Sequence, residues 1–231
     1  MTDAAYEWLE QPEAAECLEW VHRENMWTES TLAFFQRQIA HDASRVLLLL
    51  SDGGSDLLEL RELDIPKGNL VPNGFQTNCL SRMSTTWLNG DHILINHTLY
   101  GAPTTAAGWP ATTYIWKRGT DLRQATAVHT SLASDAICFV GALEPADHDR
   151  VLIVRVLDYS NIQYLLVNLD GTIERVNLPT RVPVSLSPII AAGNIVVSLA
   201  EPATVCERQL PGGSLVAYNT SPSVQRQKGC P

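Results

Sequence analysis

Two serines follow paired glycines, where a catalytic serine would be sought. They are Ser55, in Gly53-Gly54-Ser55, and Ser214, in Gly212-Gly213-Ser214. A Gly-x-Ser-x-Gly elbow holds its serine at a strand-to-helix turn, with partner Asp and His residues later in the chain. Neither serine has a glycine two positions later, and neither precedes a helical pattern. Both are predicted to lie in hairpin turns, and no catalytic residue is predicted.

The histidines and cysteines lack the spacing of a metal site. His92 and His97 are five residues apart on a predicted strand, so their side chains should project to opposite faces. Asp147-His148-Asp149 is more typical of a solvated turn than of a metal site. The cysteines are odd in number, widely spaced and free of CxxC pairs, which argues against zinc and against a disulfide framework. No metal and no cofactor is predicted. The remaining residues of these types are His22, His41, His129, Cys17, Cys79, Cys138, Cys206 and Cys230.

The tryptophans are concentrated in the first half of the chain. Such side chains can line a pocket for a peptide or a small molecule, although burial against a sheet is their commoner role. The sequence leaves both interpretations open. The six residues are Trp8, Trp20, Trp27, Trp87, Trp109 and Trp116.

The charge balance excludes some partners. The chain has 16 Lys and Arg against 25 Asp and Glu, a formal net charge of −9. Nucleic acids and anionic membranes require a basic surface, so neither is an expected partner. The longest apolar run, Val46 to Leu50, is far shorter than the ~20 residues that span a bilayer. The N-terminus shows no signal-peptide pattern. A cytoplasmic location is predicted.

The apolar spacing changes near residue 42. Within residues 5–40, apolar residues recur at helical intervals. Leu32, Phe35 and Ile39 predict a helix over Glu29–Ile39. We therefore predict a helical segment over residues 1–42, a strand region over 43–219 and a disordered tail over 220–231. The predicted strands are Arg45–Ser51, Leu57–Leu63, Thr85–Leu88, His92–Thr98, Thr113–Lys117, Thr126–Thr130, Ala136–Gly141, Val151–Asp158, Ile162–Asn168, Ile173–Asn177, Ile189–Ile190, Ile195–Leu199 and Ser214–Tyr218.

Hairpin turns separate several of these strands. Asn89-Gly90, Asp170-Gly171 and Gly193-Asn194 supply the positive φ that two-residue turns require. Short strands at close spacing indicate an all-β fold, which could be a propeller, a sandwich or a barrel. Periodicity alone does not choose among the three.

Several short motifs occur in a definite order. Near the N-terminus are Tyr6-Glu7-Trp8-Leu9-Glu10 and then Trp20, Val21, Asn25 and Thr28. The middle of the chain carries Ser51-Asp52-Gly53-Gly54-Ser55-Asp56, Arg61-Glu62-Leu63-Asp64, Gly74-Phe75, Thr86-Trp87-Leu88, Gly108-Trp109-Pro110 and Trp116-Lys117-Arg118-Gly119-Thr120. In this order they resemble the N-terminal, non-catalytic region of the prolyl oligopeptidase family of serine peptidases.

Two features depart from that family. Ala4-Ala5 replaces the usual Asp-Pro, and the resemblance passes from about His41 directly to Ser51, where family members carry further strands. It fades after about Leu143. The resemblance implies a β-propeller, which in the family is similar to a seven-bladed ring. At ~40–45 residues a blade, the strand region suffices for about four blades. The expected fold is an all-β, incomplete β-propeller of about four blades, preceded by an N-terminal helical segment.

The resemblance also implies a function. In the family, the propeller covers the active site of an α/β-hydrolase domain and restricts entry to short peptides. This chain lacks the Ser/Asp/His triad, so the expectation is a truncated, non-catalytic, substrate-gating portion of a serine endopeptidase, with the hydrolase domain as its partner. Three alternatives stay open: a free-standing binding scaffold that self-associates through open strand edges, a small-molecule-binding enzyme of non-peptidase type, and a gene fragment.

Overall fold

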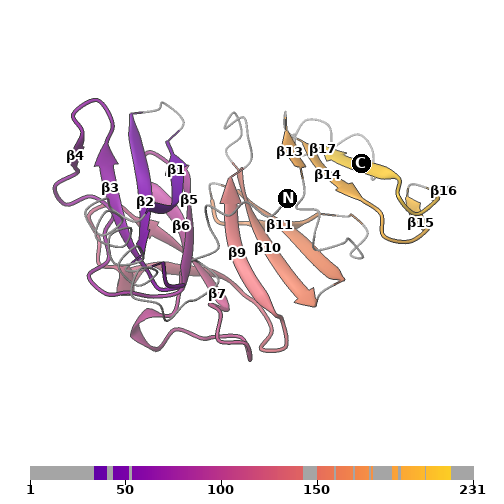
Figure 1. Ribbon diagram of the computed structural model, residues 1–231, viewed down its shortest axis with the longest axis horizontal. Helices are drawn as coiled ribbons and strands as arrows, with labels where there is room; N and C mark the ends of the chain where they lie inside the picture. Colours follow the sequence, from indigo (N-terminus) through magenta and orange to yellow (C-terminus); the bar gives the residue numbers. More distant parts are fainter. Residues whose placement is uncertain are drawn as a thin grey trace, which may run out of the picture.

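The described part of the chain is almost entirely β-strand. The computed structural model describes residues 34–40, 44–51, 54–142, 150–158, 160–168, 170–176, 178, 189–191, 194–205 and 207–219. Its strands form four successive antiparallel sheets and one small hairpin. The sheets follow one another across the molecule in chain order, from the first at the left of Figure 1 to the fourth at the right. The predicted all-β class is confirmed.

The first two sheets have four strands each, and neighbours in the chain are neighbours in the sheet. The first sheet contains β1 (Phe34–Ile39), β2 (Arg45–Ser51), β3 (Leu58–Asp64) and β4 (Asn69–Leu70). The second contains β5 (Met83–Asn89), β6 (His92–His97), β7 (Thr112–Lys117) and β8 (Thr126–Thr130), with two short 3-10 turns, η2 (Leu99–Gly101) and η3 (Leu122–Gln124).

The last two sheets repeat the pattern with one insertion. The third sheet contains β9 (Ile137–Ala142), β10 (Arg150–Asp158), β11 (Asn161–Asn168) and β12 (Ile173–Arg175). The fourth has the order β13 (Ile189–Ala191), β14 (Asn194–Ser198) and β17 (Leu215–Asn219). Between β14 and β17 the chain makes a separate hairpin of β15 (Ala203–Val205) and β16 (Arg208–Leu210).

One prediction is wrong in its secondary structure. The helix predicted over Glu29–Ile39 is replaced over Phe34–Ile39 by strand β1, which pairs antiparallel with β2. A short apolar run fits either period, and pairing with the long apolar strand β2 decides in favour of the strand. The first sheet therefore begins inside the range 1–42 that was predicted as helical. Residues 1–33 and 220–231 lie outside the described residues.

Both faces of the central strands are buried, which explains how the sheets stack. On β6, Ile93 and Ile95 pack against the first sheet, whereas Leu94 packs against the third. On β10, Val151 and Ile153 pack against the second sheet, whereas Leu152 and Val154 pack toward the fourth. Because successive side chains point to opposite faces, each of these strands contributes to two cores.

Three cores of this kind separate the four sheets, and we call them joints. The first joint lies between the first and second sheets and contains Leu47, Leu49, Leu58, Leu60, Phe75, Met83, Ile93, Ile95, Leu99, Trp116 and Leu122. The second lies between the second and third sheets and contains Leu88, Leu94, Cys138, Val140, Val151, Ile153, Leu165 and Val167. The third lies between the third and fourth sheets and contains Leu152, Val154, Ile162, Tyr164, Leu166, Val176, Leu178, Ile195, Val197, Leu199, Val216 and Tyr218.

The first strands of successive sheets are also neighbours. Strand β5 contacts β1 on one side and β9 on the other. Four antiparallel sheets packed face to face, with the first strands of the first three sheets adjacent, have the arrangement of propeller blades around an axis. The propeller architecture predicted from the sequence is therefore present over the described residues.

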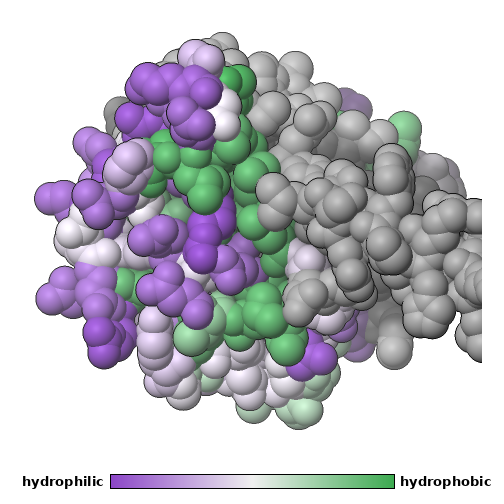
Figure 2. Space-filling model, turned by 60° about the vertical axis from the view of Figure 1, so that its left-hand side comes forward, coloured by the Kyte–Doolittle hydropathy of each residue, from purple (hydrophilic) through white to green (hydrophobic). Residues whose placement is uncertain are grey.

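The outer surface of the first sheet mixes polar and apolar residues. Figure 2 brings this side of the molecule forward and shows a band of hydrophobic residues within a hydrophilic surface. Exposed apolar side chains of the first sheet and its flanking loops are Leu57, Ile65, Leu70 and Leu80. Among the described residues, no helix has the length and apolar character to cross a membrane.

Candidate functional site

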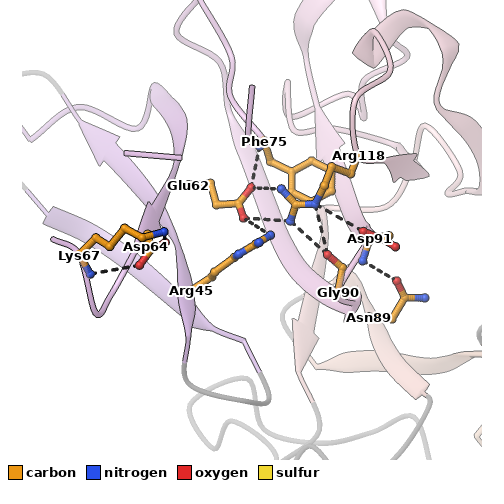
Figure 3. Close-up of polar contacts among 9 residues, drawn as sticks. All are labelled: Arg45, Glu62, Asp64, Lys67, Phe75, Asn89, Gly90, Asp91 and Arg118. Carbon is orange, nitrogen blue, oxygen red and sulfur yellow. Dashed lines mark hydrogen bonds and ion pairs between the residues drawn. The ribbon is translucent and has the colours of Figure 1, made fainter. Parts of the chain in front are cut away.

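A buried carboxylate organises the polar part of the first joint. The side chain of Glu62, on β3, has 0% exposed surface. The guanidinium of Arg118 donates from Nη1 to Oε2 at 2.8 Å and from Nη2 to Oε1 at 2.9 Å. The backbone N–H of Phe75 donates to Oε2 at 2.8 Å, and Arg45 Nη1 donates to Oε1 at 3.3 Å. Figure 3 shows these groups converging on Glu62 from separate segments.

Local structure places Arg118 opposite Glu62. Arg118 follows β7 in a turn, and Gly119 adopts the positive φ of 74° that the turn needs. The backbone N–H of Arg118 donates to the carbonyl of Asp91 at 2.8 Å, and its Nη2 donates to the carbonyl of Gly90 at 3.1 Å. The β5–β6 hairpin therefore fixes both the backbone and the guanidinium of this arginine.

Aromatic rings pack against the Glu62–Arg118 cluster on its apolar side. The Arg118 guanidinium lies 4.7 Å from the centroid of the Phe75 ring. Trp116 and Trp87 meet that ring edge to face at 5.2 Å and 5.9 Å. Neighbouring Gly74 has no room for a side chain, because a Cβ there would lie 2.8 Å from Glu62 Oε2. The cluster is thus packed on its apolar side and hydrogen-bonded on its polar side.

The arrangement makes Glu62 a structural group and not a ligand group. Each of its oxygens already accepts two hydrogen bonds, so a metal or substrate would have to displace a partner. A buried, fully satisfied ion pair is costly to break and specific in geometry. The cluster therefore fixes the first sheet against the second at one relative orientation.

The family motifs of the sequence meet at this cluster. Arg61-Glu62-Leu63-Asp64, Gly74-Phe75, Thr86-Trp87-Leu88 and Trp116-Lys117-Arg118-Gly119-Thr120 are spread over almost sixty positions, and each supplies one of the contacting groups. The other two motifs in the middle of the chain lie elsewhere. In Ser51-Asp52-Gly53-Gly54-Ser55-Asp56, the Ser51 hydroxyl donates to the carbonyl of Ser55 at 2.7 Å, and in Gly108-Trp109-Pro110 the Trp109 ring lies 5.4 Å from the Arg82 guanidinium. The sequence revealed the motifs but not that four of them form one site.

A serine and a histidine that the sequence reasoning missed are hydrogen-bonded near the second joint. Ser131 Oγ lies 3.3 Å from His129 Nε2, and Asp135 follows four residues later. Burial, together with the nearby positive charge of Arg155, lowers the pKa of His129, so its ring is neutral near pH 7. A neutral imidazole next to a hydroxyl is the first element of a serine nucleophile.

The rest of a nucleophile site is not assembled around this pair. The Asp135 carboxylate is paired with Arg155, whose Nε and Nη2 donate to Oδ2 at 2.8 Å and 2.7 Å. The N–H of Leu132 also donates to that oxygen, at 3.2 Å. Ser131 itself is only 6% exposed, so a substrate carbonyl cannot reach it. The sequence signal was the His-x-Ser spacing, which is too common to be informative.

The serines that the sequence singled out lie in turns. Ser55 is exposed in the loop between β2 and β3, where its hydroxyl donates to the carbonyl of Leu57 at 3.3 Å. Ser214 closes the turn before β17, with its N–H donating to the carbonyl of Pro211 at 3.2 Å. The structure brings neither of them to a histidine among the described residues.

The two histidines of β6 have separate surroundings. His97 is buried and stacks on Tyr114, with ring centroids 5.1 Å apart, and its Nδ1 accepts the N–H of Leu99 at 3.1 Å. Burial lowers the pKa of His97. His92 instead hydrogen-bonds to the side chain of Asn89 at 3.1 Å.

The remaining candidates do not form a site within the described ranges. Burial raises the pKa of the Cys138 thiol, which lies in the core of the second joint, and Cys79 is exposed. Within the described residues, no group of three or more His, Cys, Asp or Glu side chains could hold a metal ion. Outside the described residues lie His22, His41, His148, Cys17, Cys206, Cys230, Trp8, Trp20 and Trp27.

Fold and joints together define a propeller region with a polar cluster fixing its first two sheets. No protein-family model matches the chain. An uncharacterized peptidase of Rickettsia prowazekii is 31% identical over 157 residues, which cover 59% of this chain and 21% of that protein. An uncharacterized peptidase of Sinorhizobium fredii is 32% identical over 119 residues, which cover 51% of this chain and 16% of that protein. The chain thus spans about a fifth of the length of these relatives.

Solved structures show the same fold. A post-proline cleaving enzyme from Rickettsia typhi superposes with a TM-score of 0.73 and 22% identity, covering 84% of this chain and 30% of that chain. A prolyl endopeptidase superposes with a TM-score of 0.58 and 11% identity, covering 84% of this chain and 27% of that chain. The predicted resemblance to the propeller region of prolyl oligopeptidases is confirmed.

Proposed function

We propose that this chain forms part of the propeller of a prolyl peptidase and restricts the access of peptides to an α/β-hydrolase domain that lies outside it. The observation that carries the proposal is the one-sided coverage: 84% of this chain matches 30% of a post-proline cleaving enzyme. The serine-type chemistry would belong to the hydrolase domain. A cytoplasmic location stays a prediction.

The joints support a gating role. A propeller that restricts access must keep neighbouring sheets from separating, because a gap between them would admit longer peptides. At the first joint, the pairing of Glu62 with Arg118 resists such separation through two charge-assisted hydrogen bonds. The neighbouring apolar contacts contribute adhesion without fixing an orientation.

The first experiment tests the chain by itself. The purified protein is incubated with a proline-containing fluorogenic peptide and with a serine-directed fluorophosphonate probe. We expect no turnover and no labelled serine, because Asp135 is paired with Arg155 and Ser131 is buried. Labelling that disappears in Ser131→Ala and persists in Ser55→Ala would identify a nucleophile and overturn the non-catalytic assignment.

A second experiment tests gating. In a chimera, the matching region of the Rickettsia prowazekii peptidase is replaced by residues of this chain, and hydrolysis of short and long proline-containing peptides is compared. Glu62→Gln in the chimera should raise the rate on long peptides relative to short ones. Ser55→Ala, in an exposed turn, is the matched control and should leave that ratio unchanged. An equal ratio for Glu62→Gln and the parent chimera would contradict the gating role.

A further inference from the structure

Arg82 is a partly buried cation that has no counter-charge in the described part of the chain. It directly precedes β5, and its guanidinium lies 5.4 Å from the centroid of the Trp109 ring. Nη1 donates to the carbonyl of Gly108 at 3.3 Å. Nε is buried and has no hydrogen-bond partner within the described residues. The ring and one carbonyl therefore leave the charge of Arg82 unpaired and its Nε without an acceptor.

The other arginines in a similar environment have a carboxylate. Each of the four remaining partly buried arginine side chains that the structure describes forms an ion pair: Arg45 and Arg118 with Glu62, Arg61 with Glu59, and Arg155 with Asp135. Arg123 is the closest match in geometry, because its guanidinium also lies over an aromatic ring, 5.5 Å from the centroid of Tyr100. There Nε and Nη2 donate to the two oxygens of Asp121 at 3.0 Å and 2.6 Å. The same edge of Arg82 has no acceptor within the described residues.

A motif of the sequence holds Arg82 in place. Gly108 has a positive φ of 78°, and a Cβ on it would lie 3.3 Å from Arg82 Nη1. Glycine therefore permits both the backbone conformation and the close approach of the guanidinium. The Trp109 carbonyl accepts the N–H of Thr105 at 2.8 Å, which closes the loop on itself. Gly108-Trp109-Pro110 thus forms a fixed platform under the Arg82 guanidinium.

This platform lies at one end of the strands nearest the propeller axis. Strand β5 contacts the first strands of both neighbouring sheets, β1 and β9, and propeller blades are arranged around a central channel. The loop that carries Trp109 is attached just before β9, because the N–H of Ala106 donates to the carbonyl of Ala133 at 2.7 Å. Arg82 and Trp109 therefore lie where β5 and β9 begin, at one end of the region that the first strands surround.

We propose that Arg82 binds the carboxylate of a peptide substrate while the Trp109 ring supports its guanidinium. The proposal rests on the gating function, which brings peptides to the propeller, and it adds the chemical group that the propeller recognises. A carboxylate that reaches Nη2 also lies beside Nε, since both nitrogens are on one edge of the planar guanidinium. Both of its oxygens then accept hydrogen bonds, as those of Asp121 do from Arg123.

The first test observes the arginine Nε–H groups of the purified chain by nuclear magnetic resonance. The probe is N-acetylated alanyl-prolyl-alanine with a free C-terminal carboxylate, added up to ~10 mM because a single ion pair binds weakly. The Arg82 signal, identified by its absence in Arg82→Lys, should shift. The Arg123 signal should not, because Asp121 already accepts from its donors. The C-terminal amide of the same peptide should bind at least about 10-fold more weakly.

Two further peptides distinguish a C-terminal carboxylate from an acidic side chain. Both are C-terminal amides, and they carry glutamate or glutamine in place of the first alanine. A shift with the glutamate peptide and not with the glutamine peptide assigns acidic side chains as ligands, and a shift with the free C-terminus alone assigns chain ends. The proposal is overturned if no carboxylate shifts the Arg82 signal, or if charged and uncharged peptides shift it equally.

The second test uses the chimera with the Rickettsia prowazekii peptidase and compares kcat/KM for the charged and uncharged forms of one peptide. Arg82→Met should lower the ratio of charged to uncharged by about 10-fold. Arg123→Met is the matched control, since its guanidinium also lies over a ring, and it should leave the ratio unchanged. Circular dichroism confirms that each variant is folded.

A ratio that Arg82→Met does not change would overturn the role of Arg82 in substrate binding. Peptide length is constant in this comparison, whereas the gating experiment varies length. The carboxylate proposal and the gating proposal therefore fail separately.

Discussion

The first and third joints solve the same packing problem with different chemistry. At the first, a buried carboxylate accepts hydrogen bonds from two arginines and from the Phe75 backbone, next to a glycine without room for a Cβ. At the third, the buried core is apolar apart from two tyrosines, and Tyr164 Oη lacks a hydrogen-bond partner in the described part of the chain. The small β15–β16 hairpin adds Ala203, Val205 and Leu210 to the same apolar core.

This difference explains where the family motifs occur. Bidentate pairing and close packing are compatible with few residue types, so the residues of the first joint form recognisable motifs in the sequence. An apolar joint accepts many hydrophobic residues of similar volume, so it leaves only a pattern of strands. The resemblance accordingly fades after about Leu143, before most of the third joint, although the structural match covers 84% of the chain.

The largest effect is expected from breaking the ion pair. Glu62→Gln keeps the shape of the side chain but leaves the mostly buried Arg118 with only the exposed Asp91 as a counter-charge, 3.6 Å away. Removing one partner of a buried pair costs about 3–5 kcal/mol, and urea unfolding should show a loss of this size. The control is the double variant Glu62→Gln/Arg118→Met, which should recover part of the loss because neither charge is left alone. A loss below about 1 kcal/mol would mean that the pair does not hold the joint.

Conservative substitutions should lower the free energy of unfolding more at the first joint than at the third. Arg118→Lys keeps the charge but cannot make both hydrogen bonds to Glu62, and we expect a loss of about 2 kcal/mol. Ile195→Leu conserves volume at a fully buried position of the third joint and should cost less than about 1.5 kcal/mol. Chemical denaturation of both variants provides the comparison. Equal losses would contradict the claim that polar geometry makes the first joint the more restrictive one.

A small gain is expected at the third joint. Tyr164→Phe removes a buried hydroxyl that has no partner within the described residues and keeps the ring in place. Because an unsatisfied buried hydroxyl is costly, the free energy of unfolding should rise by up to about 1 kcal/mol. Thermal unfolding measures the change, and Tyr114→Phe, whose ring stacks on His97 at the first joint, serves as the control. A marked loss in Tyr164→Phe would show that the hydroxyl is satisfied.

Acid pH should lower the stability through a group at the first joint, and alkaline pH through a group at the third. Burial lowers the pKa of His97 below its ordinary value of 6.5, so the unfolded chain takes up a proton more readily and stability falls as the pH drops below about 6.5. Burial raises the pKa of Tyr164 from 10.0 to about 12, so the unfolded chain loses its proton first and stability falls as the pH rises from about 10 to 12. Two further groups near the second joint add to these limits: His129, whose pKa is lowered, on the acid side, and Cys138, whose pKa is raised by burial, on the alkaline side.

Urea unfolding from about pH 5 to about pH 11 measures both limits. His97→Asn should flatten only the acid side, and the lowered pKa of His129 accounts for the acid dependence that remains. Tyr164→Phe should flatten only the alkaline side, and the raised pKa of Cys138 accounts for the alkaline dependence that remains. An acid limb unaffected by His97→Asn would exclude His97 as its source.

The strands were predictable where local signals agreed. Arg45–Ser51 and Thr126–Thr130 were predicted with the bounds that β2 and β8 have, because apolar runs and turn residues mark their ends. Strand β1 was predicted as a helix, since its pairing with β2 is a tertiary interaction. The short strands β4, β15 and β16 were missed, because two or three residues carry no periodicity.

The sequence by itself determined the all-β class, most strand positions and the resemblance to prolyl oligopeptidases, because turn chemistry and restrictive motifs are local. Only the tertiary structure showed that Glu62, Phe75 and Arg118 meet, since they approach across two sheets. It also decided which face of each strand lies in which joint. A central strand that is buried on both faces is apolar at successive positions, so its sequence does not distinguish the two faces. Only the stacking order assigns each face to a neighbouring sheet.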